Sequence, residues 1–135
     1  GIDKTVKRAV PAKIIRQIRD MDLSHDSSLE YARDLFMFSF YTRGMSFIDM
    51  AYLKKSNCKR FLSYRRKKTN QQLVIKWEKP MQEIIDKYDT IGSSYLLPII
   101  LDAKTDERKQ YKNAAQLVNY KTKEIRENKS AFLFR

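Results

Sequence analysis

Apolar residues recur at helical spacing over most of the chain, and they predict a mainly helical fold. Pro11 suits the first position of a helix, and the isoleucines that follow it share one face while basic residues occupy the other. Residues 1–10 are expected to form an extended segment before the first helix. Further helices are expected over residues 27–43, 47–55, 80–88 and 105–128.

The second of these helices has clear signals at both ends. Ser27 and Glu30 form an S-x-x-E capping box, in which each side chain accepts a hydrogen bond from an amide at the start of the helix. Between the ends the segment is apolar nearly all round, as expected of a buried helix. Gly44 follows Arg43 and suits the left-handed position after a helix end, so the helix is expected to stop near Arg43.

The middle of the chain changes to strand-like runs. Residues 61–65 and 73–77 predict two short strands, and the polar, basic residues 66–72 between them predict a hairpin loop. Residues 95–101 contain Pro98 and predict either a short edge strand or a buried connection. The expected fold is therefore one mainly α (α+β) domain over residues 1–135, a helical bundle with one small antiparallel β-hairpin.

Charge narrows the expected partner. Lys and Arg number 28 against 16 acidic residues, a net charge of +12. An excess of this size on a small domain is typical of proteins that bind a polyanion, most often nucleic acid, although a merely basic protein is the alternative. The dense run Arg65–Lys68 falls inside a structured segment rather than a tail. Double-stranded DNA is the expected partner.

Several other function classes are excluded by composition. The single cysteine, Cys58, cannot form an internal disulfide, and with His25 as the only histidine no metal framework is expected. No apolar run is long enough to cross a membrane, and no signal peptide opens the chain, so a cytoplasmic location is expected. Phosphate-binding glycine loops, serine-hydrolase elbows and zinc-protease motifs are absent, and no cofactor is expected.

Two segments resemble a known family. Residues 32–53, ARDLFMFSFYTRGMSFIDMAYL, are similar to the first catalytic box of the tyrosine recombinases, or phage integrases, and especially to integrases of mobile elements. Residues 62–69, LSYRRKKT, resemble the β-hairpin that carries the catalytic lysine of that family. The resemblance extends from Thr5 to about Ile125, with the elements in the same order.

The resemblance implies DNA integration by metal-free strand exchange. In the family a tyrosine attacks a phosphodiester and forms a phosphotyrosyl intermediate, arginines hold the phosphate, and the hairpin lysine protonates the departing 5′ oxygen. A guanidinium suits this role because it binds two phosphate oxygens in parallel and stabilises the charge of the transition state. The family also implies that the parent protein assembles as a tetramer on DNA.

The resemblance assigns roles to particular residues. The family arginine stands three residues before an acid, and Ser46 occupies that place, so the expected phosphate-binding guanidinium is Arg43, three residues earlier. Lys68 precedes a threonine, as the hairpin lysine does in many relatives, and is the expected general acid. Further DNA contacts are expected from Ser46, Arg65, Arg66 and Lys67.

Structural alternatives remain for these residues. Residues 46–49 have the pattern of a capping box for the next helix, in which Asp49 braces the loop rather than reacts. Arg43 also suits a helix C-terminus, where a cation offsets the helix dipole. Lys67 and Lys68 also suit solvated, non-specific contacts with the DNA backbone.

The family's H-x-x-R box and nucleophilic tyrosine have no counterpart after Leu101. The chain is therefore expected to be a truncated part of a catalytic domain, inactive alone. The alternatives are a non-catalytic basic helical DNA-binding domain and a purely structural helical module.

Overall fold

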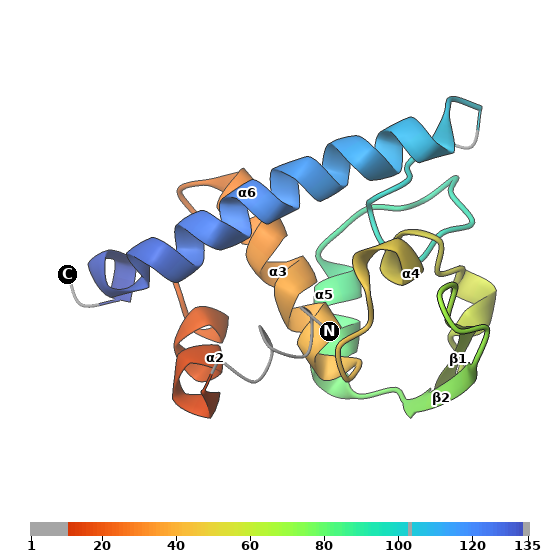
Figure 1. Ribbon diagram of the computed structural model, residues 1–135, viewed down its shortest axis with the longest axis horizontal. Helices are drawn as coiled ribbons and strands as arrows, with labels where there is room; N and C mark the ends of the chain where they lie inside the picture. Colours follow the sequence, from red (N-terminus) through yellow and green to blue (C-terminus); the bar gives the residue numbers. More distant parts are fainter. Residues whose placement is uncertain (1–10, 103, 134–135) are drawn as a thin grey trace. The chain divides into compact units, whose positions relative to one another are not determined.

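The computed structural model describes residues 11–102 and 104–133, with side chains described as far as Glu127, so the expected lead-in over residues 1–10 lies outside the described residues. Helices dominate, and one two-stranded antiparallel sheet completes the fold, which confirms the expected α+β class (Figure 1). In chain order the elements are α2 (Ala12–Arg19), α3 (Ser27–Tyr41), α4 (Phe47–Ala51), η1 (Lys55–Asn57), β1 (Phe61–Arg65), β2 (Gln72–Lys76), α5 (Lys79–Asp86) and α6 (Glu107–Leu133).

The chain divides into two compact units. Of the described residues, the first unit comprises residues 11–37 and 116–133, and the second comprises residues 38–102 and 104–115. Helices α3 and α6 each contribute residues to both units. Among the described helices, none combines the length and the apolar character that a membrane span requires.

The first unit contains a buried arginine that joins two helices. Arg33, on α3, is only 8% exposed, and its Nη1 donates hydrogen bonds to the carbonyl oxygens of Ile18, Arg19 and Met21 at 3.3, 3.1 and 2.8 Å. Its Nε lies 2.9 Å from the carboxylate of Asp34, which is also buried. These carbonyls include the last ones of α2, which have no partner within their own helix. Arg33 therefore caps α2 from the neighbouring helix.

The start of α3 and the end of α6 differ from expectation. The amides of Ser28 and Leu29 donate to Asp26 Oδ1 at 3.0 and 3.2 Å, so Asp26, rather than Ser27, caps α3. A carboxylate at this position also interacts favourably with the helix dipole. Helix α6 begins after Asp106, whose carboxylate accepts from the Lys109 amide at 3.2 Å, but it extends beyond the predicted end near residue 128.

The second unit carries the hairpin. Phe61 pairs with Lys76 and Arg65 with Gln72, so the loop spans residues 66–71 and β2 begins one residue earlier than predicted. Leu62, Tyr64 and Ile75 face the core, whereas the alternate positions face solvent, as the two-residue period of a strand requires. Among the described residues, the other face of the sheet is therefore the more exposed one.

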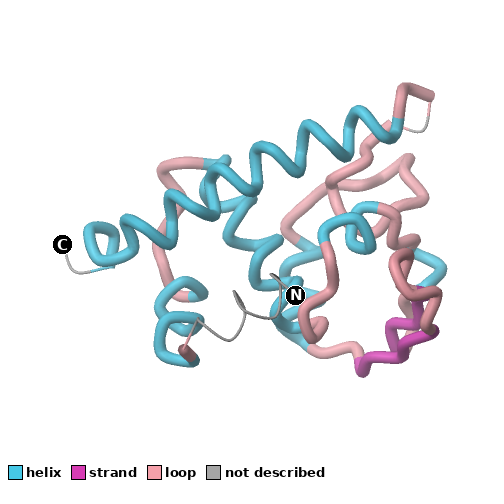
Figure 2. The backbone as a smooth tube through the Cα atoms, in the orientation of Figure 1, coloured by secondary structure: helices cyan, strands magenta, loops and turns pink. Residues whose placement is uncertain are grey.

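A long connection without helix links α5 to α6 in the second unit (Figure 2). It is fastened to the α4–η1 segment, because the Leu96 amide donates to Leu53 O at 2.8 Å and the Lys55 amide donates to Ser94 O at 2.9 Å. Its apolar residues are mostly buried, so residues 95–101 form a buried connection rather than an edge strand, and only Tyr95 makes an isolated bridge there. Helix α4 ends at residue 51, four residues before the predicted end, and η1 follows it.

Candidate nucleic-acid interface

The turn after α3 places Arg43 in an unusual backbone conformation. Arg43 has φ 62° and Gly44 has φ 82°. The Gly44 amide donates to Ser39 O at 2.7 Å and the Arg43 amide to Phe40 O at 3.1 Å, which is the hydrogen-bond pattern of a Schellman motif. Gly44 is left-handed, as expected, but the residue that ends the helix in this motif is Arg43 itself, in a place usually taken by glycine.

This conformation is costly for an arginine. A residue with a Cβ loses roughly 1–2 kcal/mol in the left-handed region. The Arg43 side chain is exposed, and no hydrogen bond or ion pair joins its guanidinium to another described residue. Among the described residues, the Arg43 side chain therefore contributes little to the fold.

Replacement of Arg43 by glycine should stabilise the protein. Glycine removes the Cβ strain, while its greater freedom in the unfolded chain costs roughly 0.5–1 kcal/mol, so we expect a net gain of about 0.5–1 kcal/mol in the free energy of unfolding. Urea unfolding measures it. Asn70 has φ 59°, and asparagine tolerates this region, so Asn70→Gly serves as the matched control with a smaller gain. A less stable Arg43→Gly protein would contradict the strain argument.

Ser46 and Asp49 position the helix that follows. Ser46 is the N-cap of α4, and its Oγ accepts a hydrogen bond from the Asp49 amide at 3.3 Å. The Asp49 carboxylate is directed elsewhere: its Oδ1 accepts from the backbone amide of Lys67 at 3.0 Å, although Asp49 is only 6% exposed. The capping box is thus half formed, and Asp49 links α4 to the hairpin loop.

The same loop places a lysine ammonium on an aromatic ring. Lys67 Nζ lies 4.4 Å from the centre of the Tyr52 ring. Tyr52 in turn contacts Tyr95 and Tyr111, with ring centres 6.0 and 6.4 Å away. A cation at this distance from a ring is attracted by the π electrons of the ring. Lys67 is therefore the hairpin lysine whose ammonium group has a defined place.

The aromatic cluster under Lys67 is held by a phenol hydrogen bond. Tyr95 Oη donates to Glu107 Oε2 at 2.8 Å. Burial, then the hydrogen bond to Glu107 and its negative charge, raises the pKa of Tyr95 to about 12. Burial and the nearby Asp49 charge also raise the pKa of Tyr64. A raised pKa makes these phenols harder to ionise than an ordinary tyrosine, which is already neutral at physiological pH, and this fits structural roles for both.

The remaining predicted residues lie around the hairpin loop. Arg65 ends β1, and its Nη1 donates to Asn70 O at 2.7 Å, so this guanidinium helps to shape the loop. Arg66 is the first loop residue, and its backbone is bonded to Asn70 and Gln71. Lys68 is exposed, and no interaction joins its side chain to another described residue.

A small hollow of about 90 Å³ brings part of this set together. Asp49, Tyr52, Arg65 and Lys67 are among the residues that line it. Arg43 and Lys68 are not among its lining residues. That Arg43 and Lys68 touch one phosphate stays a prediction.

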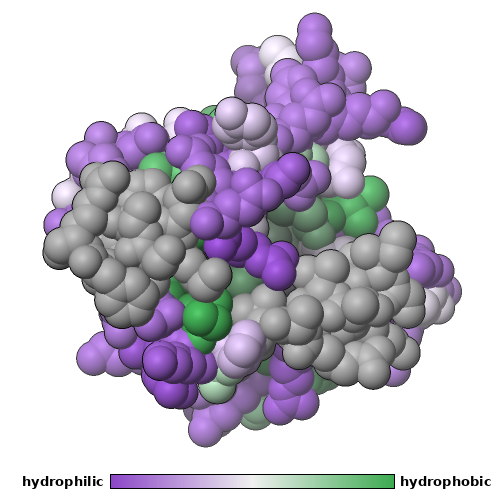
Figure 3. Space-filling view, turned by 60° about the vertical axis from the view of Figure 1, so that its left-hand side comes forward, coloured by the Kyte–Doolittle hydropathy of each residue, from purple (hydrophilic) through white to green (hydrophobic). Residues whose placement is uncertain are grey.

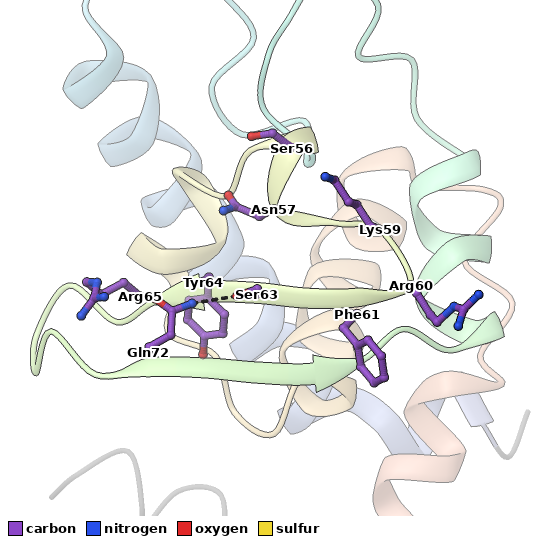
Figure 4. Close-up of a pocket in the computed structure, with 9 residues that line it drawn as sticks. All are labelled: Ser56, Asn57, Lys59, Arg60, Phe61, Ser63, Tyr64, Arg65 and Gln72. Carbon is purple, nitrogen blue, oxygen red and sulfur yellow. Dashed lines mark hydrogen bonds between the residues drawn. The ribbon is translucent and has the colours of Figure 1, made fainter.

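A second, larger hollow lies along β1 (Figure 4). It has a volume of about 560 Å³, and Lys59, Arg60 and Arg65 supply its cations. Neither this hollow nor the role of Tyr52 was predicted from the sequence, because both depend on contacts that sequence spacing does not show. The sequence does contain one sign of this hollow: residues 61, 63 and 65 alternate with the buried positions and so lie on one face of the strand.

Much of the surface drawn in Figure 3 is hydrophilic, in keeping with the charge of the chain. Within the described ranges, no group of three or more His, Cys, Asp or Glu side chains is arranged to hold a metal ion. Comparison with known protein families, with curated proteins and with solved structures finds no match.

Proposed function

We propose that this chain binds double-stranded DNA as the leading part of a tyrosine-recombinase catalytic domain. The observation that carries the proposal is the hydrogen bond between Asp49 Oδ1 and the Lys67 amide. It ties the two segments that resemble the family, the one containing Arg43 and the basic hairpin loop, into one local structure. A net charge of +12 supports a nucleic-acid partner.

In this proposal Arg43 binds a DNA phosphate through two parallel N–H groups, which needs a guanidinium that is not engaged within the protein. The hairpin loop supplies the leaving-group lysine. Lys68 is the residue expected from the family pattern, whereas Lys67 is the one whose ammonium lies at a defined place on Tyr52. No nucleophile is assigned to this chain.

The test is duplex binding as a function of salt. We expect the affinity for a duplex of about 20 base pairs to fall steeply between about 50 and 200 mM salt, because bound phosphates release counterions. Arg43→Gln, Lys67→Gln and Lys68→Gln should each reduce the slope of log K against log salt by about one. Lys123→Gln, which removes the same charge from an exposed lysine of the first unit, is the control and should change the slope less.

Arg43→Lys separates a two-pronged phosphate contact at Arg43 from simple charge attraction. It keeps the charge and the left-handed backbone but removes the two-pronged donor. Weaker binding by Arg43→Lys, similar to that of Arg43→Gln, supports a phosphate clamp. Unchanged binding favours simple charge attraction, and a flat salt response of the native chain contradicts DNA binding altogether.

A further inference from the structure

The hollow along β1 has the composition of a nucleic-acid site. Among the lining residues drawn in Figure 4, three are cations, namely Lys59, Arg60 and Arg65, and none is a carboxylate. A concave surface with one sign of charge concentrates ligands of the opposite sign. The expected ligand is therefore an anion.

Arg60 and Arg65 lie at the two ends of the hollow, and Lys59 lies between them. Lys59 and Arg60 precede β1, and Arg65 ends it, as Figure 4 shows. The backbone between Arg60 and Arg65 covers about 16 Å at the rise of a β-strand. One phosphate ion cannot contact both ends, whereas a chain of linked phosphates can. Arg65 uses one N–H toward Asn70 O and has further donors for an anion.

Phe61 adds an exposed aromatic surface to the hollow. It is 49% exposed, although β1 buries its neighbour Leu62 completely. An aromatic ring beside cations is the combination with which proteins bind unpaired bases: the base stacks on the ring and the backbone follows the positive charges. Within a duplex the faces of the bases are covered by their neighbours, so such a ring favours unpaired nucleotides.

Neutral polar groups occupy the space between the cations. Ser63 Oγ accepts a hydrogen bond from Gln72 Nε2 at 2.7 Å across the two strands. Ser56 and Asn57 border the hollow from η1. Serine, asparagine and glutamine side chains carry donors and acceptors that suit base edges and sugar hydroxyls. The volume of about 560 Å³ falls within the range of sites for small organic molecules and is far too small for a duplex.

We propose that the hollow between η1 and β1 binds unpaired nucleotides of a nucleic-acid strand, with a base stacked on Phe61 and backbone phosphates on Arg60 and Arg65. This site does not include Arg43 or the hairpin lysines, although Arg65 lines both this hollow and the smaller hollow beside Lys67. It requires no recombinase chemistry.

The experiment measures binding of the full chain to a fluorescent oligothymidine of about ten nucleotides, a length within the range of known single-strand sites. Phe61→Leu keeps an apolar side chain but removes the ring, and we expect the affinity to fall about 5- to 100-fold. Phe61→Trp should retain or improve binding. Arg60→Gln should reduce the salt slope by about 0.7, the value for a single strand.

Val74→Ala is the matched control, because Val74 is 62% exposed on the same face of the sheet but does not line the hollow. Unchanged oligothymidine affinity in Val74→Ala, together with a loss in Phe61→Leu, supports the site. Equal losses in the two variants would indicate a general apolar contact and overturn it. Thermal unfolding of each variant shows whether the fold is kept, and Arg60→Gln tests the site independently of any change at Phe61.

The two proposals fail in different ways. If duplex binding depends on Arg43 but the Phe61→Leu variant binds oligothymidine as tightly as the native chain, the single-strand site is wrong and the duplex proposal stands. If Phe61→Leu abolishes oligothymidine binding while Arg43→Gln leaves duplex binding unchanged, the single-strand site stands and the duplex proposal is wrong.

Discussion

Replacing Arg33 by alanine is expected to lower the free energy of unfolding by about 3–5 kcal/mol. The substitution removes hydrogen bonds to three backbone carbonyls at the end of α2 and the ion pair with buried Asp34. Both losses occur where water does not easily replace the missing donor, because Arg33 and Asp34 are 8% and 4% exposed. Chemical unfolding followed by circular dichroism measures the change.

An exposed arginine of the same unit provides the control. Arg19 pairs with Asp20 at 2.8 Å, but their side chains are 47% and 64% exposed. Arg19→Ala should therefore cost less than about 1 kcal/mol, the usual limit for a surface ion pair. Arg33→Lys should recover only part of the loss, because an ammonium cannot reproduce the geometry of a guanidinium that serves several acceptors. Equal effects of Arg33→Ala and Arg19→Ala would show that the buried contacts contribute little.

The role of Arg33 also shows what local sequence patterns cannot predict. The apolar run of α3 and the signals at its two ends predicted the helix, and the strand-like runs around the basic loop predicted the hairpin, because these patterns are local. Arg33 lies in the middle of that apolar stretch, and its partners are 12 to 15 residues earlier in the chain. No local spacing marks a side chain that caps another helix, so this contact was not predicted.

The candidate site was also predicted only in part. Its residues were identified from the family resemblance and the basic run, but their connections were not. Asp49 was expected to brace its own loop, whereas it holds the Lys67 amide 18 residues away. Gly44 was expected to be the left-handed residue after the helix, and Arg43 is left-handed as well. In both cases the residue type pointed to a role near the site. The hydrogen-bond partner of Asp49 and the backbone conformation of Arg43 depend on the tertiary fold and could not be read from local sequence.

The second large effect on stability is expected from removing the hydrogen bond between Asp49 and the Lys67 amide. Asp49→Ala is expected to lower the free energy of unfolding by about 2–3 kcal/mol, since it removes a buried, charge-assisted hydrogen bond and leaves the Lys67 amide without its acceptor. Asp49→Asn keeps an oxygen acceptor of the same reach and should lose about 1 kcal/mol, because a neutral hydrogen bond replaces a charge-assisted one. Urea unfolding of the two variants measures this order.

Duplex binding separates the effect of the Asp49 charge from the effect of its hydrogen bond to the hairpin loop. Asp49→Asn removes a negative charge near the loop, which by itself should strengthen binding to a polyanion. If Asp49 instead acts by holding the loop in place, Asp49→Ala should bind duplex DNA more weakly than Asp49→Asn, although the two variants carry the same net charge. In urea unfolding, Ser46→Ala is the control for α4, because it removes the other hydrogen bond at the start of this helix but leaves the Lys67 amide bonded. Equal duplex affinity in Asp49→Ala and Asp49→Asn would mean that the hairpin lysines reach DNA without this link.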